Sequence, residues 1–302
     1  MNSRRIMLLV LLALLPGAAI AVYFYGTGYL ANIVAATILG LGMEALCLGL
    51  QRRAVLEAIT DGSTLVTCVL LALALPPQVP WPVLGVAVAA AVIIAKHLYG
   101  GLGNNLFNPA VVGYTVVLVS FPAVMADWPI PVDGLTNATA LVALKYREGA
   151  TVAEAWTASR GFGNLGGYAW EWINLGYLIG GVALLVGRLA AWRIPATILV
   201  TIGVLAIAGY DNGSAASWGS PVYHWFSGGT MLTAFFFATD PVTHPASAKG
   251  QFVYAILIGT VIFVVRSLGN YPDGAAFAVL LGNAVSPYLD RRLTTADVTA
   301  DA

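Results

Sequence analysis

The sequence predicts an all-α, polytopic membrane protein, and three observations carry that prediction. Of its 302 residues, 59% are hydrophobic and only 9% are charged. The mean hydropathy is +0.83, and the apolar residues come in runs of helical length separated by polar turns. The 14 basic and 14 acidic residues balance, so the composition predicts no partnership with nucleic acid.

About ten apolar segments follow one another and define the expected helices. They span residues 6–24, 30–50, 63–75, 82–96, 109–125, 172–187, 193–210, 229–239, 251–267 and 274–289. The first follows Arg4 and Arg5 and ends in the aromatic residues Tyr23 and Phe24, which suit a membrane interface. We therefore interpret it as a spanning helix and not as a cleaved signal peptide.

Two of the segments are too short for a simple crossing and end at proline. The third stops at Pro76 and Pro77, and the eighth stops at Asp240 and Pro241. Proline removes a backbone donor, so both are predicted to be helices broken within the membrane zone.

The broken segments stand at equivalent places if the chain is divided into two halves of five segments. The division gives a first repeat at 1–125, a loop at 126–171, a second repeat at 172–290 and a tail at 291–302. In each half a basic residue, Lys96 or Arg266, precedes a turn rich in glycine and asparagine. Because five is odd, the halves are predicted to be inverted relative to each other, with paired discontinuous helices around a midplane site. Chance likeness between glycine-rich turns is the alternative.

The basic residues predict the orientation, because cytoplasmic loops hold the excess of Lys and Arg. With a cytoplasmic N-terminus, ten fall inside: Arg4, Arg5, Arg52, Arg53, Lys96, Arg188, Arg193, Lys249, Arg291 and Arg292. Four fall outside: Lys145, Arg147, Arg160 and Arg266. Both termini are therefore predicted to be cytoplasmic, and the long loop 126–171 lies on the opposite face.

That loop contains the motif at 133–139, DGLTNAT, which ends in Thr139. The spacing of Asp133, Thr136, Ala138 and Thr139 resembles the acceptor site of flavin transferases, which esterify FMN through its phosphate onto a threonine hydroxyl. An ordinary polar turn, with Thr136 or Asn137 capping a helix from about 138 to 145, is the alternative. The sequon Asn137-Ala138-Thr139 competes only in a eukaryotic secretory route, and the sequence GFGNLG at 161–166 lacks the preceding strand that a dinucleotide fingerprint needs.

Three further stretches extend the resemblance over nearly the whole chain. They are IAKHLYGGLGNNLFNPA at 94–110, TDPVT at 239–243 and YPDGAAFAVLL at 271–281. With DGLTNAT they resemble, in order, the signatures of the RnfD subunit of bacterial Rnf complexes, which is related to the NqrB subunit of the sodium-pumping quinone reductase. The chain departs from the family in being short before Asp133 and in carrying Asn137 where many members have a small residue.

The resemblance implies a urea-channel-like fold and a subunit, inactive alone, of a redox-driven translocase that couples electron exchange between ferredoxin and NAD to sodium or proton movement. It implies covalent FMN on Thr139, a possible non-covalent riboflavin among the helices, and a flavin transferase for maturation. The implied partners are Rnf subunits A, B, C, E and G, in the lipid of a bacterial inner membrane, with Thr139 on the periplasmic side.

Ionisable residues in apolar segments are costly and are therefore functional candidates. Glu44, Asp240 and Asp273 are predicted candidates for an ion route, with Asp61, Lys96 and Arg266 in the same class. The alternative for Glu44 is a hydrogen bond between helices. The alternative for Asp240 and Asp273 is that they cap the ends of broken helices.

Other residues are ambiguous around the expected flavin. Lys145 and Arg147 are either solvated loop residues or stabilisers of a reduced, anionic flavin. Four tryptophans are either ring-stacking partners or interface anchors: Trp128, Trp156, Trp170 and Trp172. Cys47 and Cys68 lie in apolar segments, and His97, His224 and His244 are scattered, so no metal site is predicted.

Two rival functions use the same architecture. A passive solute channel or transporter also has inverted repeats with broken helices, and it would need a continuous polar pore and no flavin. A non-redox membrane scaffold would dock redox subunits without carrying electrons. Fold alone does not choose among the three.

Overall fold

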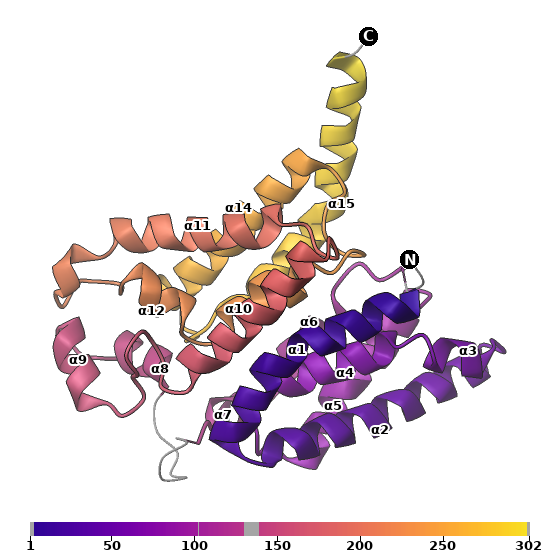
Figure 1. Cartoon of the computed structure of the whole chain (residues 1–302), viewed down its shortest axis with the longest axis horizontal. Coiled ribbons are helices and arrows are strands. Elements are labelled where there is room, and N and C mark those ends of the chain that lie inside the picture. The colour runs from indigo at the N-terminus through magenta and orange to yellow at the C-terminus, as the bar shows by residue number, and fades with distance from the viewer. Residues whose placement is uncertain (1–2, 102, 130–138, 301–302) are drawn as a thin grey trace.

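The computed structural model describes residues 3–101, 103–129 and 139–300, and this part of the chain is helical throughout (Figure 1). This part of the chain holds no β-strand, although an isolated bridge joins Phe162 and Gly167. The all-α prediction is therefore confirmed. Asp133, Thr136, Asn137 and Ala138 lie outside the described residues.

The first half of the chain forms seven helices, which agree closely with the predicted segments. They are α1 (Ser3–Tyr25), α2 (Gly28–Leu50), α3 (Val55–Ile59), α4 (Ser63–Ala74), α5 (Trp81–Ala89), α6 (Pro109–Ser120) and α7 (Pro122–Ala126). A π-helical segment, Ala90–His97, continues α5. Helix α4 ends just before Pro76, as predicted, while Pro122 divides the predicted fifth segment into α6 and α7.

The long loop carries two short helices, α8 (Ala140–Lys145) and α9 (Val152–Ala158). The second half then forms α10 (Trp170–Val186), α11 (Arg193–Ala208), α12 (Pro221–Trp225), α13 (Thr230–Leu232), α14 (Ala248–Leu268) and α15 (Ala275–Ala300). A 3-10 turn, Asp211–Gly213, follows α11, and a π-helical segment, Thr233–Phe237, continues α13 up to the predicted break at Pro241. Helix α15 extends past residue 290, so most of the predicted tail is helical.

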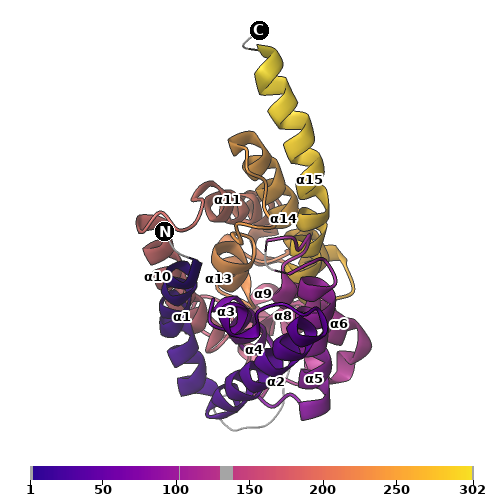
Figure 2. The ribbon, with the colours of Figure 1, turned by 90° about the vertical axis from the view of Figure 1, so that its right-hand side faces the viewer.

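Helices α1 and α10, the first long helix of each half, lie side by side where the two halves meet (Figures 1 and 2). Small residues permit this close approach, because a Cβ on Gly180 would collide with the Ala13 carbonyl oxygen and one on Gly176 would lie 2.7 Å from Gly17 Cα. Glycines spaced four apart pack membrane helices in this way. The halves therefore share one continuous core.

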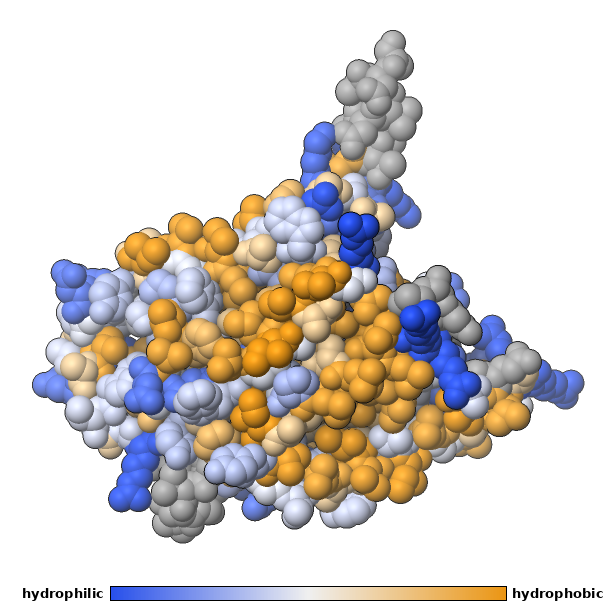
Figure 3. All heavy atoms as spheres, viewed as in Figure 1, coloured by the Kyte–Doolittle hydropathy of each residue, from blue (hydrophilic) through white to orange (hydrophobic). Residues whose placement is uncertain are grey.

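The face of the molecule shown in Figure 3 carries a broad apolar region with hydrophilic residues around it. Large hydrophobic side chains are exposed along the outer faces of several long helices, among them Leu12 on α1, Ile38 on α2, Val182 on α10 and Val204 on α11. Such extended apolar surface is rare on soluble monomers. Within the described residues three helices, α1, α2 and α14, are long and apolar enough to cross a membrane, and five shorter apolar helices accompany them.

Candidate functional site

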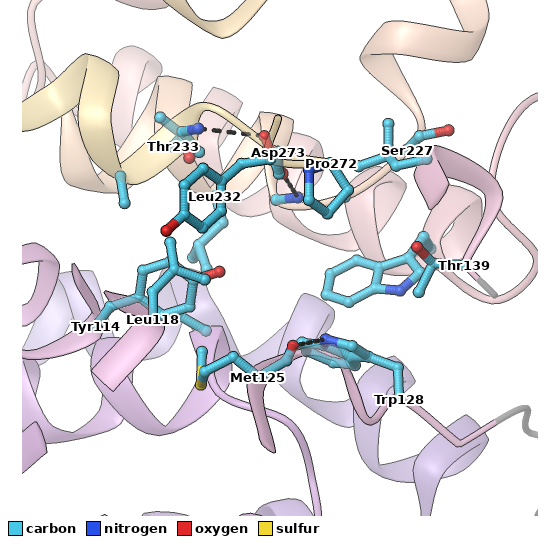
Figure 4. Close-up of a pocket in the computed structure, with 18 of the residues that line it drawn as sticks. Tyr114, Leu118, Met125, Trp128, Thr139, Ser227, Leu232, Thr233, Pro272 and Asp273 are labelled. Atoms are coloured by element: carbon cyan, nitrogen blue, oxygen red, sulfur yellow. Dashed lines mark hydrogen bonds between the residues drawn. The ribbon is translucent and has the colours of Figure 1, made fainter. Parts of the chain in front are cut away.

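A cavity lies where the long loop packs against the broken helix of the second half, and its empty volume, which includes space open to solvent, is about 1050 Å³ (Figure 4). Apolar and aromatic side chains dominate its wall, including Leu73, Leu118, Met125, Trp128, Trp170 and Leu232. A mainly apolar wall with a few polar groups is typical of ligand pockets.

Thr139 stands on the wall of this cavity, directly before α8. It is the N-cap of α8, and its Oγ1 accepts a hydrogen bond from the Val142 N–H at 3.4 Å. The predicted helix is therefore present, with Thr139 as its cap in place of the predicted Thr136 or Asn137, which lie outside the described residues. The prediction of a modified hydroxyl is compatible with this cap, since the oxygen also faces an apolar chamber.

Two tryptophans from separate segments form one side of the chamber. The rings of Trp128 and Trp170 lie 5.2 Å apart, edge to face, and Tyr25 at the end of α1 packs against both. The Trp128 indole N–H donates to the Met125 carbonyl at 3.0 Å, which fixes the ring. These two are therefore placed to contact a planar ligand.

The other two candidate tryptophans do not reach the cavity. Trp156 stacks on Phe162 at 4.5 Å and donates to the Gly163 carbonyl at 2.8 Å, within the small core of the loop. Trp172 is 49% exposed on α10, as an interface anchor would be.

Asp273 and the glycines before α13 form the opposite wall. Asp273 accepts from Arg266 Nε and Nη2, both at 3.1 Å, from the Ala275 N–H at 3.2 Å and from the Gly229 N–H at 3.4 Å. Gly228 has a φ of +57°, and a Cβ there would lie 2.5 Å from the Asp273 carboxylate. Asp273 thus caps α15, the alternative left open by the sequence, and also holds the start of α13.

Two hydroxyl groups on the cavity wall are unsatisfied. Ser227 Oγ and Thr233 Oγ1 are buried, and neither has a hydrogen-bond partner among the described residues. A buried polar group without a partner costs about 1–3 kcal/mol. A ligand with hydrogen-bonding atoms on its edge would remove that cost.

Lys145 and Arg147 are partly buried, and their charged groups are held by backbone carbonyls. The Lys145 ammonium donates to three carbonyls around the end of α14, those of Val265, Arg266 and Tyr271, at 2.8 to 3.0 Å. Arg147 donates to Leu144, Ala150, Ala215 and Ser217 carbonyls. Partial burial lowers the pKa of both side chains, whose charges hold the loop to the helices.

His224 lies behind the same wall, on α12. Its Nε2 lies 2.9 Å from the Trp218 carbonyl, while Nδ1 is buried without a partner among the described residues. Burial and the neighbouring Arg266 guanidinium lower the pKa of His224 to about 3. The imidazole is therefore neutral at physiological pH.

A second cavity, with an empty volume of about 880 Å³, lies toward the other end of α1. Met7 and Val10 of α1 line it, whereas Tyr25 packs beside the first cavity, and 18 helical residues separate Met7 from Tyr25, about 27 Å. Its polar lining residues include Lys96, Asn105, Asn108 and Asp240. The described lining residues of the two cavities do not overlap.

Glu44 has the partner that its burial requires. Its Oε1 accepts from Lys96 Nζ at 2.6 Å, and the same ammonium donates to Ser63 Oγ at 2.8 Å and Thr64 Oγ1 at 2.6 Å. His97 Nε2 lies 3.7 Å from Glu44 Oε1. Glu44 Oε2 is buried with no hydrogen-bond partner in the described part of the chain.

Asp240 lies at a junction between the halves. Its Oδ2 accepts from Asn108 Nδ2 at 3.3 Å, and its Oδ1 accepts from the Val242 N–H at 3.2 Å. The Asn108 N–H in turn donates to Asn283 Oδ1 at 3.0 Å, while its own side chain caps α6. The described residues contain no group of three or more His, Cys, Asp or Glu side chains that could hold a metal ion.

The comparison with known families agrees with this architecture. The NQR2, RnfD, RnfE family model matches residues 1–298. The chain belongs to this family. The resemblance to RnfD inferred from the sequence motifs is thereby confirmed.

Relatives in the NQR2, RnfD, RnfE family are named as the D subunit of an ion-translocating oxidoreductase complex. The protein from Aeromonas hydrophila subsp. hydrophila is 44% identical over 325 aligned positions, which cover 96% of this chain and 92% of the relative. That from Pseudomonas paraeruginosa is 43% identical, with 96% and 90% covered, and that from Cellvibrio japonicus is 39% identical, with 96% and 89% covered. The Aeromonas alignment is longer than this chain, so that family member has segments that this one lacks.

Sequence reasoning missed Ser227, Thr233 and the glycines beside them. Nothing in the sequence distinguishes these hydroxyls from the other serines and threonines of the chain. A break at this point could have been inferred from Gly228 and Gly229, which stand at the start of a short apolar segment.

Proposed function

We propose that this chain is the membrane subunit of an ion-translocating ferredoxin:NAD oxidoreductase complex and carries electrons on an FMN esterified to Thr139. One observation carries the proposal: the predicted acceptor threonine stands on the wall of the first cavity, which is apolar and has unsatisfied hydroxyls. The names of the relatives, which span nearly the same length, point to the same complex.

The residues around the cavity fit an isoalloxazine ring. Trp128 and Trp170 offer aromatic faces beside Thr139, and the apolar side chains exclude water. Ser227 and Thr233 offer hydrogen bonds to the polar edge of the ring. The bound FMN would supply electron transfer, while the protein fixes the position of the ring and tunes its potential.

The second cavity is the candidate site for the non-covalent riboflavin. It is comparable in size, and amide and acidic groups of Asn105, Asn108 and Asp240 line it. These groups are both donors and acceptors, as the hydroxylated side chain and pyrimidine ring of riboflavin require.

The membrane topology remains part of the proposal. About ten spans in two inverted repeats, with both termini in the cytoplasm, place the Thr139 loop on the periplasmic face of a bacterial inner membrane. The other Rnf subunits, A, B, C, E and G, and a flavin transferase are the proposed partners. Sodium and proton both remain candidates for the transported ion.

The three acidic candidates differ in their capacity to carry that ion. Glu44 keeps one oxygen without a partner among the described residues and Asp240 lines the second cavity, so both suit an ion route. Asp273 is committed to Arg266 and to helix capping, which favours a structural role.

The passive channel is the weaker alternative. A channel needs a continuous polar pore, but in the described residues the two cavities are separate and Leu73, Val111 and Phe237 line the inner side of the first one. A scaffold without redox function would leave the chamber and its unsatisfied hydroxyls without a purpose.

The test is in-gel flavin fluorescence of the chain produced with its flavin transferase and run under denaturing conditions. Fluorescence on wild type and its absence from Thr139→Ala support the proposal. Thr151→Ala is the matched control, because Thr151 also caps a short helix of the loop, α9, yet lies outside the motif. Absence of fluorescence from wild type, or fluorescence on Thr139→Ala, contradicts the attachment.

A further inference from the structure

Thr233 differs from four other threonines within or beside the helices of this chain. Thr60, Thr115, Thr157 and Thr239 each donate their hydroxyl to the carbonyl four residues earlier, at 2.6 to 3.2 Å. This is the usual hydrogen bond of a threonine hydroxyl within a helix. Thr233 Oγ1 makes no such bond, although the residue is only 1% exposed. Thr37 on α2 shares this lack of a partner among the described residues, but it lines neither cavity.

The local backbone leaves the Thr233 hydroxyl beside an opening. Thr233 begins the π-helical segment Thr233–Phe237, in which the Ala238 N–H donates to the Thr233 carbonyl at 2.9 Å. Single π turns are frequent at functional sites. One turn earlier Gly229 has no side chain, and even a Cβ there would lie 4.0 Å from Thr233 Oγ1.

The chemistry of the flavin predicts which of its edges reaches Thr233. The ribityl chain leaves the ring system at N10, and N5, next to the O4 carbonyl, lies on the opposite edge of the middle ring. A flavin tethered at Thr139 therefore turns its N10 edge toward Thr139 and its N5–O4 edge toward the far wall. Figure 4 shows Thr233 across the cavity from Thr139.

We propose that the Thr233 hydroxyl donates a hydrogen bond to the N5–O4 edge of the flavin and thereby sets the orientation of the ring and its reduction potential. This inference rests on the proposed attachment at Thr139. A hydroxyl both donates and accepts, so it satisfies N5 whether or not N5 carries a hydrogen. Donation to O4 favours the reduced ring, because that ring is richer in electrons.

The test compares Thr233→Val, which keeps the shape and removes the hydroxyl, with Thr233→Ser, which keeps the hydroxyl. Each chain is matured with the transferase, and its flavin absorption spectrum and midpoint potential are measured. Thr233→Val is expected to lower the ratio of reduced to oxidised flavin about tenfold at a given potential, a shift of about 30 mV for two electrons. Thr233→Ser is expected to restore the wild-type potential and spectrum.

Ser227→Ala is the matched control, because it removes the other unsatisfied hydroxyl of the cavity, on the side of Thr139 in Figure 4. It is expected to move the potential less than Thr233→Val does. If Thr233→Val does not accumulate in the membrane, Thr233→Ala takes its place under the same criteria.

Attached flavin with a wild-type potential and spectrum in Thr233→Val overturns the inference and leaves the proposed function intact. An equal shift in Thr233→Ser and Thr233→Val also overturns it, since packing alone would then explain both. Absence of flavin from wild type overturns the proposed function and the inference together.

Discussion

Lys96 and Arg266 stand at matching places in the two halves of the chain and hold the starts of two broken helices. Lys96 donates to Ser63 and Thr64 at the start of α4, and Arg266 donates to Thr230 at the start of α13 at 2.9 Å. The two clusters lie beside different cavities. The inverted relation of the two halves stays a prediction.

The clusters differ in how fully their polar atoms are used. Arg266 bonds to Asp273, to Thr230 and to the carbonyls of His224 and Ser227, and both Asp273 oxygens accept. Lys96 has a single acid partner in the described residues, Glu44, which retains a buried oxygen without a partner there. The Arg266 cluster therefore forms a rigid frame beside the first cavity, and the Lys96 cluster keeps a Glu44 oxygen without a partner in the described residues.

Charge removal at the two clusters is expected to give the largest effects. Lys96→Met leaves the buried Glu44 carboxylate unpaired, which costs about 3–5 kcal/mol of unfolding free energy. Arg266→Met leaves the Asp273 carboxylate unpaired, at a smaller cost for that group because it is 21% exposed. Adding Glu44→Gln to Lys96→Met is expected to recover most of the loss, because the ion pair is the main bond of that cluster. Adding Asp273→Asn to Arg266→Met is not, since the carbonyls of His224 and Ser227 lose the Arg266 donors and are left to share the single Thr230 hydroxyl.

Denaturant unfolding in detergent measures these differences. Full recovery in the Arg266 double variant would contradict the contrast, as would no recovery in the Lys96 double variant. Repeating each single variant in a Thr139→Ala background separates folding from flavin loading.

A glycine with positive φ precedes each broken helix, and substitution there sharpens the comparison. A Cβ on Gly62, which has φ +84°, would meet Met7 Cβ at 3.1 Å, a tight contact that a small shift relieves, so Gly62→Ala is expected to cost about 1–2 kcal/mol, mainly from backbone strain. At Gly228 a Cβ would press on Asp273 and on Leu141 Cδ1 at 2.7 Å, so Gly228→Ala is expected to cost about 3 kcal/mol. Equal losses of unfolding free energy in Gly62→Ala and Gly228→Ala would show that the Arg266 cluster is no more rigid than the Lys96 cluster.

A smaller effect is expected from acid at His224, whose carbonyl accepts a hydrogen bond from Arg266. The unfolded chain protonates His224 near pH 6.5, whereas the folded chain does so only near pH 3. The stability that this residue contributes is therefore complete above about pH 6.5 and falls as the pH drops, by about 2 kcal/mol at pH 5. Unfolding of His224→Gln and of wild type is measured at pH 7 and at pH 5. The variant is expected to lose about 2 kcal/mol less unfolding free energy than wild type between these two pH values. An identical pH dependence of the two proteins would refute the low pKa of His224.

The sequence predicted the elements of this fold better than it predicted their contacts. Pro76 and Pro241 marked both broken helices, because proline acts locally, and the similar turns after residues 96 and 266 marked the two basic side chains. Their partners were not predictable, since Lys96 meets residues 32 to 52 positions away.

Residues of the loop and cavity show the same limit. Lys145 was interpreted as solvated or flavin-facing and instead caps α14, a contact across 120 positions. Thr139 was predicted from its motif, but the chamber beside it arises from segments that lie far apart in the sequence. The unsatisfied hydroxyl of Thr233 depends on a π turn that no residue pattern signals.

The most direct test of the central claim is the mass of the peptide that contains Thr139, taken from the chain matured with its flavin transferase. We expect the peptide to gain the mass of one FMN less one water, and fragmentation to locate this gain on Thr139. An unmodified peptide under conditions that load flavin onto the chain, or FMN on another residue, would contradict it.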